Sequence, residues 1–220
     1  KLFERIEYLW SNRSSLNLSP EQERVLMLTH RSFVRAGSQL KGKAADRMAQ
    51  IKSRLATLGT NFTQNLLADE RDWFLNLTDA DLLGLPDFVV ASARAAGQEK
   101  GANGPVVTLS RSLTVPFLQF SERRDLREII YKAWTSRGAN GGATDNRNAA
   151  TETLELRHEK ATLLGFDCFA DFKLTTEMAK TPRRVRELLM EVWAPAKACA
   201  DIDAKILEKM MEKDGIRGPL

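Results

Sequence analysis

The stretch that decides the fold is ATDNRNAATETLELRHEKATLLGFDCFADFK, residues 143–173. An Asn-Arg pair leads into a charged segment of helical composition that stops at Gly165. Glycine often ends a helix because it adopts left-handed backbone angles without steric cost. A second short segment then begins with an aromatic residue and an Ala-Asp pair, at Phe169. The stretch therefore predicts one helix over about 145–164 and a short one after it.

Toward the N-terminus the sequence predicts two more helices. Ser19-Pro20-Glu21-Gln22 has Ser at the N-cap, Pro at the first position and Gln at the third, which is a capping box. This helix should run to about Ala36 and stop at Gly37. The next helix shows apolar residues at intervals of three and four, namely Met48, Ile51, Leu55, Leu58, Phe62 and Leu66.

The middle of the chain changes character. Residues 73–78 alternate in the way typical of a strand, and residues 105–110 are a second strand candidate. Residues 86–96 have helical composition and residues 97–104 read as a loop. We expect the strands to pair as an antiparallel ribbon covered by helices, because a two-stranded ribbon is marginal alone.

The C-terminal part is again helical. Ser121 should cap a helix that ends near Arg137, and Thr181-Pro182 should start a long amphipathic helix that reaches Met211. Pro195 should kink it, because proline removes a backbone donor and clashes with the preceding turn. Trp193 is expected to be largely buried. The fold class is therefore mostly α: a multi-helix bundle with a small two-stranded antiparallel β ribbon.

Composition excludes several classes of protein. Hydrophobic residues make up 43% and charged residues 28%, and the net charge is +4 with both signs interspersed. This favours a mixed surface over a nucleic-acid partner. No apolar run is long enough to cross a membrane, and no secretory signal opens the chain. Cys168 and Cys199 are the only cysteines, so we expect a reduced, cytoplasmic location.

No catalytic or metal-binding residue can be assigned from the sequence. His158-Glu159 resembles the start of a His-Glu-x-x-His zinc motif, but the position of the second histidine holds Thr162. The other histidine, His30, fits a hydrogen-bonded residue at the edge of a core better than a ligand. A pairing of His158 with Cys168 would need a proximity that sequence does not show.

Two arginine groups and one glycine-rich loop are weaker candidates. Arg123, Arg124 and Arg127 cluster on one helix, and Arg183, Arg184 and Arg186 on another. Either group could bind a carboxylate in a bidentate manner, but pairing with nearby Asp125, Glu128 or Glu187 is the simpler reading. Residues 137–142, RGANGG, fit an interhelical loop better than a phosphate-binding loop, and their glycines would allow movement.

Several segments together resemble the thimet oligopeptidase and peptidyl-dipeptidase family of zinc metallopeptidases. They are residues 143–173, Leu18–Glu23, His30–Leu40, Leu55–Leu67, Leu83–Pro86 and Met178–Pro182. Their order along the chain is more specific than any one of them. The strings LSPEQ and TDNR favour the peptidyl-dipeptidase branch.

The resemblance implies two helical halves facing each other across a channel that admits short peptides. Zinc would be held by the motif histidines and a later glutamate, all outside this chain. Residues 1–220 would be the non-catalytic N-terminal helical part and one channel wall, inactive alone, without nucleic-acid or membrane partners. Any sub-boundary would fall near residues 138–144.

The ends of the chain support the same expectation. It starts without Met inside an amphipathic segment, and residues 215–220 look like a loop. We expect apolar surface that faces a missing part, and self-association through it. The alternative is a free-standing helical adaptor that binds a peptide or a helix in a groove.

Overall fold

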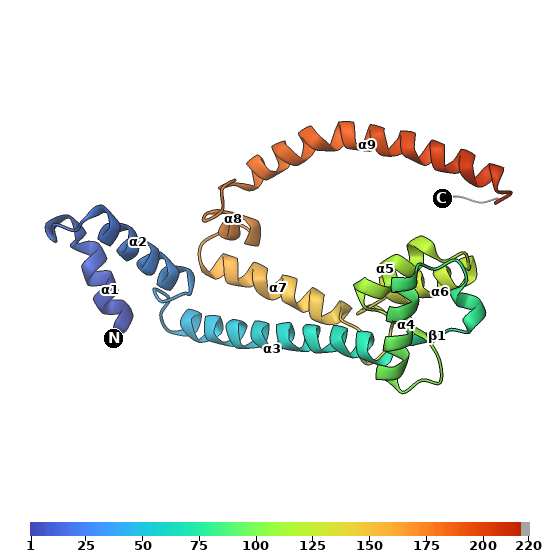
Figure 1. The fold of residues 1–220 in the computed structure, drawn as a ribbon. Coiled ribbons are helices and arrows are strands. Elements are labelled where there is room, and N and C mark those ends of the chain that lie inside the picture. Colours follow the sequence, from blue (N-terminus) through green and yellow to red (C-terminus); the bar gives the residue numbers. More distant parts are fainter. Residues whose placement is uncertain (217–220) are drawn as a thin grey trace. The chain divides into compact units, whose positions relative to one another are not determined.

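The computed structural model describes residues 1–216, so the end of the loop expected at 215–220 lies outside the described residues. The chain divides into two compact units. Unit 1 comprises Lys1–Ala45 and the chain from Arg157 onward, and unit 2 is Asp46–Leu156. Helices, with the 3-10 turns included, account for 71% of residues 1–216, and the strands form a small two-stranded sheet (Figure 1). The predicted fold class, mostly α with a small ribbon, is confirmed.

Unit 1 begins with a helical pair. Helix α1 (Leu2–Ser11) packs on α2 (Pro20–Arg35), with the 3-10 turn η1 (Arg13–Ser15) between them. The predicted capping box is confirmed: the Gln22 backbone N–H donates to the Ser19 hydroxyl at 3.3 Å, and the Ser19 N–H donates to the Gln22 side chain at 2.9 Å. Gly37 follows the end of α2 with a φ of 90°.

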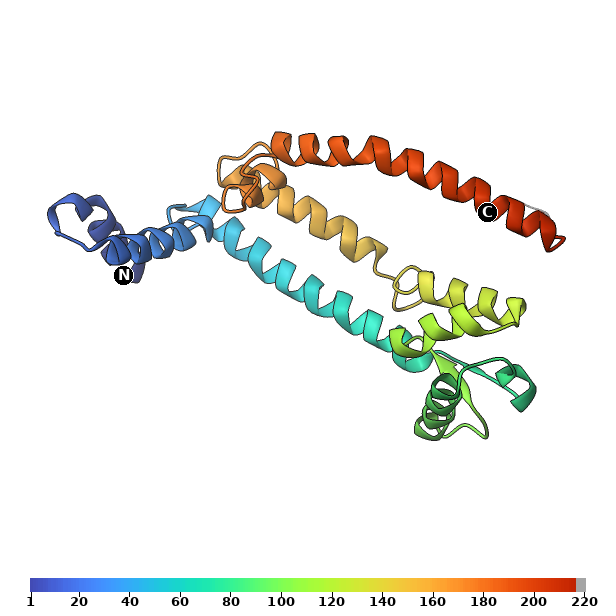
Figure 2. The same cartoon turned by 45° about the horizontal axis from the view of Figure 1, so that its top comes forward.

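The second part of unit 1 ends in a long exposed helix. Helix α8 (Phe169–Leu174) is followed by α9 (Pro182–Lys213), whose N-cap Thr181 accepts from the Arg184 N–H at 3.3 Å. Helix α9 continues through Pro195 and is visibly curved (Figure 1, Figure 2). The structure describes every residue of α9, and none of them is buried. The predicted burial of Trp193 is therefore wrong, since 57% of this residue is exposed.

Unit 2 contains most of α3 (Lys43–Asp72) and the sheet. The other elements are β1 (Phe74–Asn76), the 3-10 turn η2 (Asp79–Leu82), α4 (Asp87–Lys100), β2 (Val106–Thr108), α5 (Arg111–Phe120) and α6 (Arg124–Thr135). Helix α7 (Arg147–Leu163) starts in unit 2 and ends in unit 1. The expected loop at 97–104 starts later than predicted, because α4 runs to Lys100 and ends on the left-handed Gly101.

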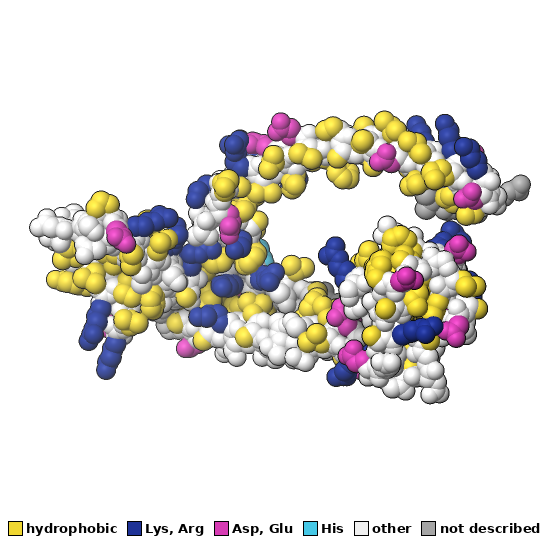
Figure 3. All heavy atoms as spheres, viewed as in Figure 1, with side chains coloured by type: hydrophobic (Ala, Val, Ile, Leu, Met, Phe, Trp, Pro, Cys, Tyr) yellow, Lys and Arg dark blue, Asp and Glu magenta, His cyan; other side chains and the backbone are white. Residues whose placement is uncertain are grey.

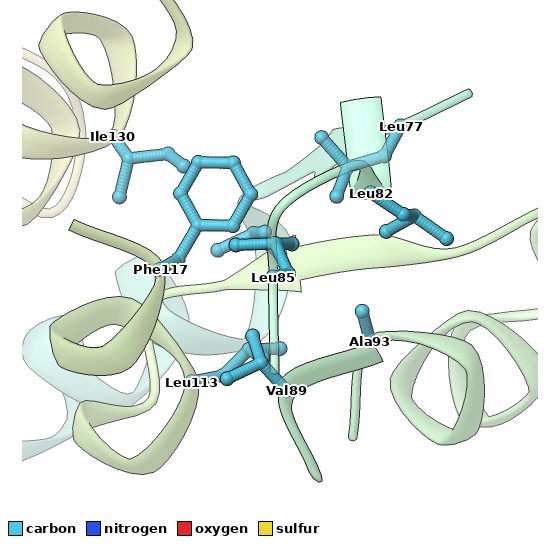
Figure 4. Close-up of a cluster of buried hydrophobic side chains, with 9 residues drawn as sticks. Leu77, Leu82, Leu85, Val89, Ala93, Leu113, Phe117 and Ile130 are labelled. Atoms are coloured by element: carbon cyan, nitrogen blue, oxygen red, sulfur yellow. The ribbon is translucent and has the colours of Figure 1, made fainter. Parts of the chain in front are cut away.

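The predicted antiparallel ribbon is confirmed and lies against the main core. Strands β1 and β2 pair with Leu75 opposite Val107. Helix α4 contacts β2, and α5 contacts both β2 and α6. Their buried side chains form one cluster, in which Phe117 of α5 points toward Ile130 of α6 (Figure 4). The cluster consists of Leu77, Leu82, Leu85, Val89, Ala93, Val107, Leu113, Phe117 and Ile130.

Helix α5 is the element that the sequence did not predict. Residues 105–110 were expected to be a strand that leads to a helix start at Ser121. Instead, α5 occupies Arg111–Phe120 with Pro116 inside it, and the buried Ser121 is its C-cap. The Ser121 hydroxyl accepts from the Arg123 N–H at 3.2 Å, and α6 then begins at Arg124.

Candidate functional site

The most organised polar region of unit 2 is the loop of residues 136–146 between α6 and α7. It folds around Asp69, which lies near the end of α3. The Gly138 N–H donates to one carboxylate oxygen of Asp69 at 2.7 Å. The Asn140 amide donates to the other oxygen at 3.0 Å, and the Thr144 hydroxyl donates to it as well. Asp69 therefore holds three separate points of the loop.

These contacts determine the electrostatics of Asp69. Burial alone would raise the pKa of its carboxyl, but the Gly138 N–H and the Thr144 and Asn140 side chains favour the charged form and bring the pKa below its ordinary value. A carboxylate that accepts three hydrogen bonds and is held ionised is a weak base. Asp69 is thus suited to anchoring the loop, and not to proton transfer.

A second set of contacts fixes the far end of the loop. Asn146 is buried, and its amide donates to the Phe62 carbonyl at 3.0 Å while its side-chain oxygen accepts from Asn65 at 2.9 Å. The Asn146 N–H donates to the Gly138 carbonyl at 2.7 Å. Gly138 itself has a φ of 69°, in the left-handed region that favours glycine. The loop is consequently tied to two successive turns of α3.

A cavity of about 380 Å³ lies beside this loop. Its lining includes both apolar and polar side chains, with Trp73 as the aromatic one. Arg137 at its edge pairs with Glu70 and donates from Nε to the Trp134 carbonyl at 3.0 Å. A concave surface with polar groups held in place is suited to binding a ligand. Its lining comprises Ala68, Asp69, Asp72, Trp73, Leu109, Ala133, Ser136, Arg137, Asn140 and Thr144.

The sequence indicated this loop but not its anchor. Residues 137–142 were predicted to be an interhelical loop, and they do connect α6 to α7. Asp69 was not singled out, because its partners lie about seventy residues further along the chain. The Asn-Arg opening of residues 143–173 was the available signal, since Asn146 is the buried residue that closes the loop.

The two histidines have separate environments in unit 1. His30 donates to or accepts from Glu7 at 2.7 Å, is stacked on Trp10 at 4.9 Å between ring centroids, and has a side chain only 12% exposed. The prediction of a hydrogen-bonded histidine at a core edge is confirmed. His158 is exposed on α7. The Cys168 thiol donates to Asp171 at 2.9 Å, so its recorded partner is a carboxylate and not His158.

Three of the six arginines singled out in the sequence, Arg123, Arg183 and Arg184, form the local ion pairs that the simpler reading predicted. Arg123 pairs with Asp125 at 2.7 Å and also with Asp81. The Arg123 side chain brings the pKa of Asp125 down to about 2. Arg183 and Arg184 both pair with Glu187, at 2.7 and 3.4 Å. Arg127 instead donates to the Ser121 carbonyl.

Residues 1–216 do not fit a zinc site. Within this range, no three His, Cys, Asp or Glu side chains are grouped so that they could hold a metal ion. The position four residues after His158 is Thr162, whose hydroxyl donates to the His158 carbonyl at 3.2 Å. In the same part of the chain, no helix is both long and apolar enough to cross a membrane.

Comparison with known proteins identifies the class of protein. Residues 117–218 match the model of peptidase family M3. Dipeptidyl carboxypeptidase of Escherichia coli (strain K12) is 30% identical over 215 residues, which is 97% of this chain and 32% of that protein. Oligopeptidase A of Salmonella typhimurium is 33% identical over 180 residues, 80% of this chain and 26% of that protein. The chain belongs to peptidase family M3.

The similarity extends beyond bacteria at a lower level. Saccharolysin of Saccharomyces cerevisiae is 22% identical over 217 residues, 97% of this chain and 30% of that protein. The chain thus spans about a third of the length of these curated relatives. Both the oligopeptidase and the dipeptidyl carboxypeptidase groups are represented among them, which agrees with the family resemblance seen in the sequence.

Proposed function

We propose that this chain is the non-catalytic N-terminal helical part of a cytoplasmic zinc metallopeptidase that hydrolyses short oligopeptides, and that it forms one wall of the substrate channel. The observation that carries the proposal is the continuous similarity of 97% of the chain to 32% of a dipeptidyl carboxypeptidase. Zinc would be bound by residues outside this chain. The chain would contribute binding surface and shape, and no chemical step.

The surface of α9 supports this proposal. Its apolar residues recur at intervals of three and four, and more than half of Leu188, Val192, Ile202, Ile206 and Met210 is exposed. Figure 3 shows hydrophobic side chains along the length of this helix. A continuous apolar face of this kind is typical of a surface that another polypeptide covers. The remaining two thirds of a protein like the relatives would supply that cover.

The test compares this chain with the protein expressed from the full reading frame. We expect the longer protein to contain stoichiometric zinc and to cleave short peptides, and the 220-residue chain to do neither. Stoichiometric zinc in the chain alone, or hydrolysis that survives controls for contaminants, would contradict the proposal. A reading frame that stops near Leu220 would support the adaptor.

One substitution tests the role of α9. Ile206→Asp places a charge in the exposed apolar face. In the 220-residue chain we expect almost no change in the denaturant midpoint. In the longer protein we expect a large loss of stability, because a charge buried without a partner is costly. Ile206→Leu is the matched control for both proteins. Equal small effects in the two proteins would show that α9 is not covered.

A further inference from the structure

Unit 1 contains a cluster of positive charge that none of the arginine groups noted in the sequence predicted. Arg31 and Arg35 lie one helical turn apart near the end of α2, and Arg157 and Lys160 lie one turn apart on α7. Like charges three or four residues apart on a helix repel each other. Arg35 from the first pair and both members of the second pair contact α8. We call these four residues the basic cluster.

Aromatic rings of α8 contact three of the four cations, Arg35, Arg157 and Lys160. The Arg35 guanidinium lies 4.0 Å from the ring centroid of Phe172, and the Lys160 ammonium lies 5.4 Å from the same ring. The Arg157 guanidinium lies 5.4 Å from the ring centroid of Phe169. Phe172 is buried, and its ring is 5.9 Å from that of Phe169. Phe169 and Phe172 therefore hold three members of the cluster together, and Arg31 lies one turn before Arg35 on α2.

Arg35 has a structural role in addition to its charge. It donates to the Phe172 carbonyl at 2.9 Å and to the Thr175 hydroxyl at 2.5 Å, and so connects α2 to the end of α8. Burial lowers the pKa of this guanidinium, and the nearby charge of Arg31 lowers it further, while Glu177 opposes the shift. Arg31 therefore lies close enough to Arg35 for the two positive charges to repel each other.

Two carboxylates of this part of unit 1 have close partners other than Arg31 and Arg157. Glu177 pairs with Lys173 at 2.8 Å, and Asp171 accepts from the Cys168 thiol. Arg31 and Arg157 form no ion pair or hydrogen bond within residues 1–216. Figure 3 shows Lys and Arg side chains gathered where α2 ends near α8 and the end of α7. By contrast, Arg183 and Arg184 on α9 share Glu187.

We propose that the basic cluster binds a carboxylate group of a peptide, with Arg31 and Arg157 as the contacting side chains and Arg35 as a positioning residue. Arginine presents a planar fork of donors that matches a carboxylate. The contact with Phe169 restricts the Arg157 side chain before binding, which lowers the entropy lost on forming the contact. The choice of a peptide over another anion rests on the proposed function.

The experiment is calorimetric titration of the 220-residue chain with three acetylated hexapeptides of matched sequence. One has Glu side chains and an amidated C-terminus, one has Gln side chains and a free C-terminus, and one has Gln side chains and an amide. We expect one or both of the carboxylate peptides to bind more tightly than the neutral one, and their ranking assigns the source of the carboxylate. Binding should weaken as salt is added.

Variants locate the binding to the cluster. Arg31→Gln combined with Arg157→Gln should weaken binding of the carboxylate peptide by about tenfold or more, because each removes a charge-assisted hydrogen bond. Arg31→Lys keeps the charge but not the fork, and should lose part of the affinity while it preserves folding. The matched control is Arg183→Gln combined with Arg184→Gln, which removes equal charge from the same unit and should change affinity less than about twofold.

Three results would overturn the assignment. The first is equal binding of all three peptides, and the second is an equal loss in the control and the cluster variants. The third is tight binding of inorganic phosphate with no binding of either carboxylate peptide. None of these results depends on hydrolysis. The binding experiment can therefore fail while zinc content and activity of the longer protein support the proposed function. Equally, peptide binding can be found while the longer protein lacks zinc and activity.

Discussion

The core of unit 2 and helix α9 of unit 1 are both rich in apolar residues, but only the first is packed. In unit 2, short elements surround a two-stranded ribbon, and nine buried side chains form one cluster. Helix α9 has 32 residues, and none of them is buried. Apolar periodicity is present in both regions. The difference shows that apolar periodicity marks a helix face that can pack against another element. Whether that face is buried depends on which other elements the chain provides.

The largest expected effect on stability is in the packed core of unit 2. Phe117→Ala removes a ring that is 0% exposed at the centre of the unit 2 cluster. We expect it to destabilise the protein by about 3–5 kcal/mol, the range for truncation of a buried large aromatic residue. Chemical denaturation measures the change. Phe120→Ala, on the same helix and 39% exposed, is the matched control and should cost much less.

The next effect concerns the loop between α6 and α7. Asp69→Asn replaces a carboxylate that accepts three hydrogen bonds with an amide. The NH₂ group of that amide is itself a donor, so it cannot accept a hydrogen bond from the loop. We expect a loss of about 2 kcal/mol at neutral pH. The control is Asp72→Asn, one turn further along α3, whose carboxylate accepts hydrogen bonds from the neighbouring Arg71 and none from the loop within residues 1–216. An equal effect of the two substitutions would show that the loop is held by other contacts.

The Asp69 effect should depend on pH in a defined direction. The pKa of Asp69 is lower in the folded state than its ordinary value. Its contribution to stability is therefore complete above the unfolded-state value of about 3.9 and is lost as the pH falls through the lower folded-state value. The difference between Asp69→Asn and the parent should be constant near neutrality and shrink below about pH 4.

A smaller effect is expected at a glycine of the same loop. Gly138 has a φ of 69°, and a Cβ atom there would lie 3.0 Å from a Leu66 methyl carbon. Gly138→Ala should destabilise by about 1–2 kcal/mol, since non-glycine residues are strained in left-handed backbone. Gly59→Ala is the opposite case: its Cβ would meet no atom within 4 Å. That change should stabilise α3 by up to about 1 kcal/mol.

The smallest effect on stability is expected in the exposed helix α9. Trp193→Ala in the 220-residue chain should change the free energy of unfolding by about 0.5 kcal/mol or less, as is usual for exposed positions. Denaturation under the conditions used for Phe117→Ala makes the two directly comparable. A loss of several kcal/mol would show that α9 packs on other parts of the chain in solution.

Local signals in the sequence predicted most of the helices and both strands. The capping box at Ser19, the Thr181-Pro182 start and the stop at Gly165 are properties of adjacent residues, so they can be read directly. Helix α5 was missed because Pro116 and β-branched neighbours weaken its local preference for helix. It is stabilised by tertiary contacts instead, since Leu113 and Phe117 are buried in the unit 2 core.

The sites were less predictable than the fold. The Asp69 anchor and the basic cluster each join residues separated by about seventy to one hundred and forty positions. Clusters of arginine within one helix were visible in the sequence, but proximity along a helix also supplied their counter-ions, as Glu187 does for Arg183 and Arg184. The basic cluster formed where separate helices met, and no local pattern reports that.

The two thiols of this chain differ in a way that makes α9 accessible to chemistry. Cys199 is exposed on α9, whereas Cys168 is half-buried and donates to Asp171 at 2.9 Å. A thiol-specific reagent should therefore modify Cys199 first. A fluorophore or spin label can thus be attached to the apolar helix of the native sequence without any substitution. The same position would become protected if another polypeptide covered α9, so the labelling rate reports assembly directly.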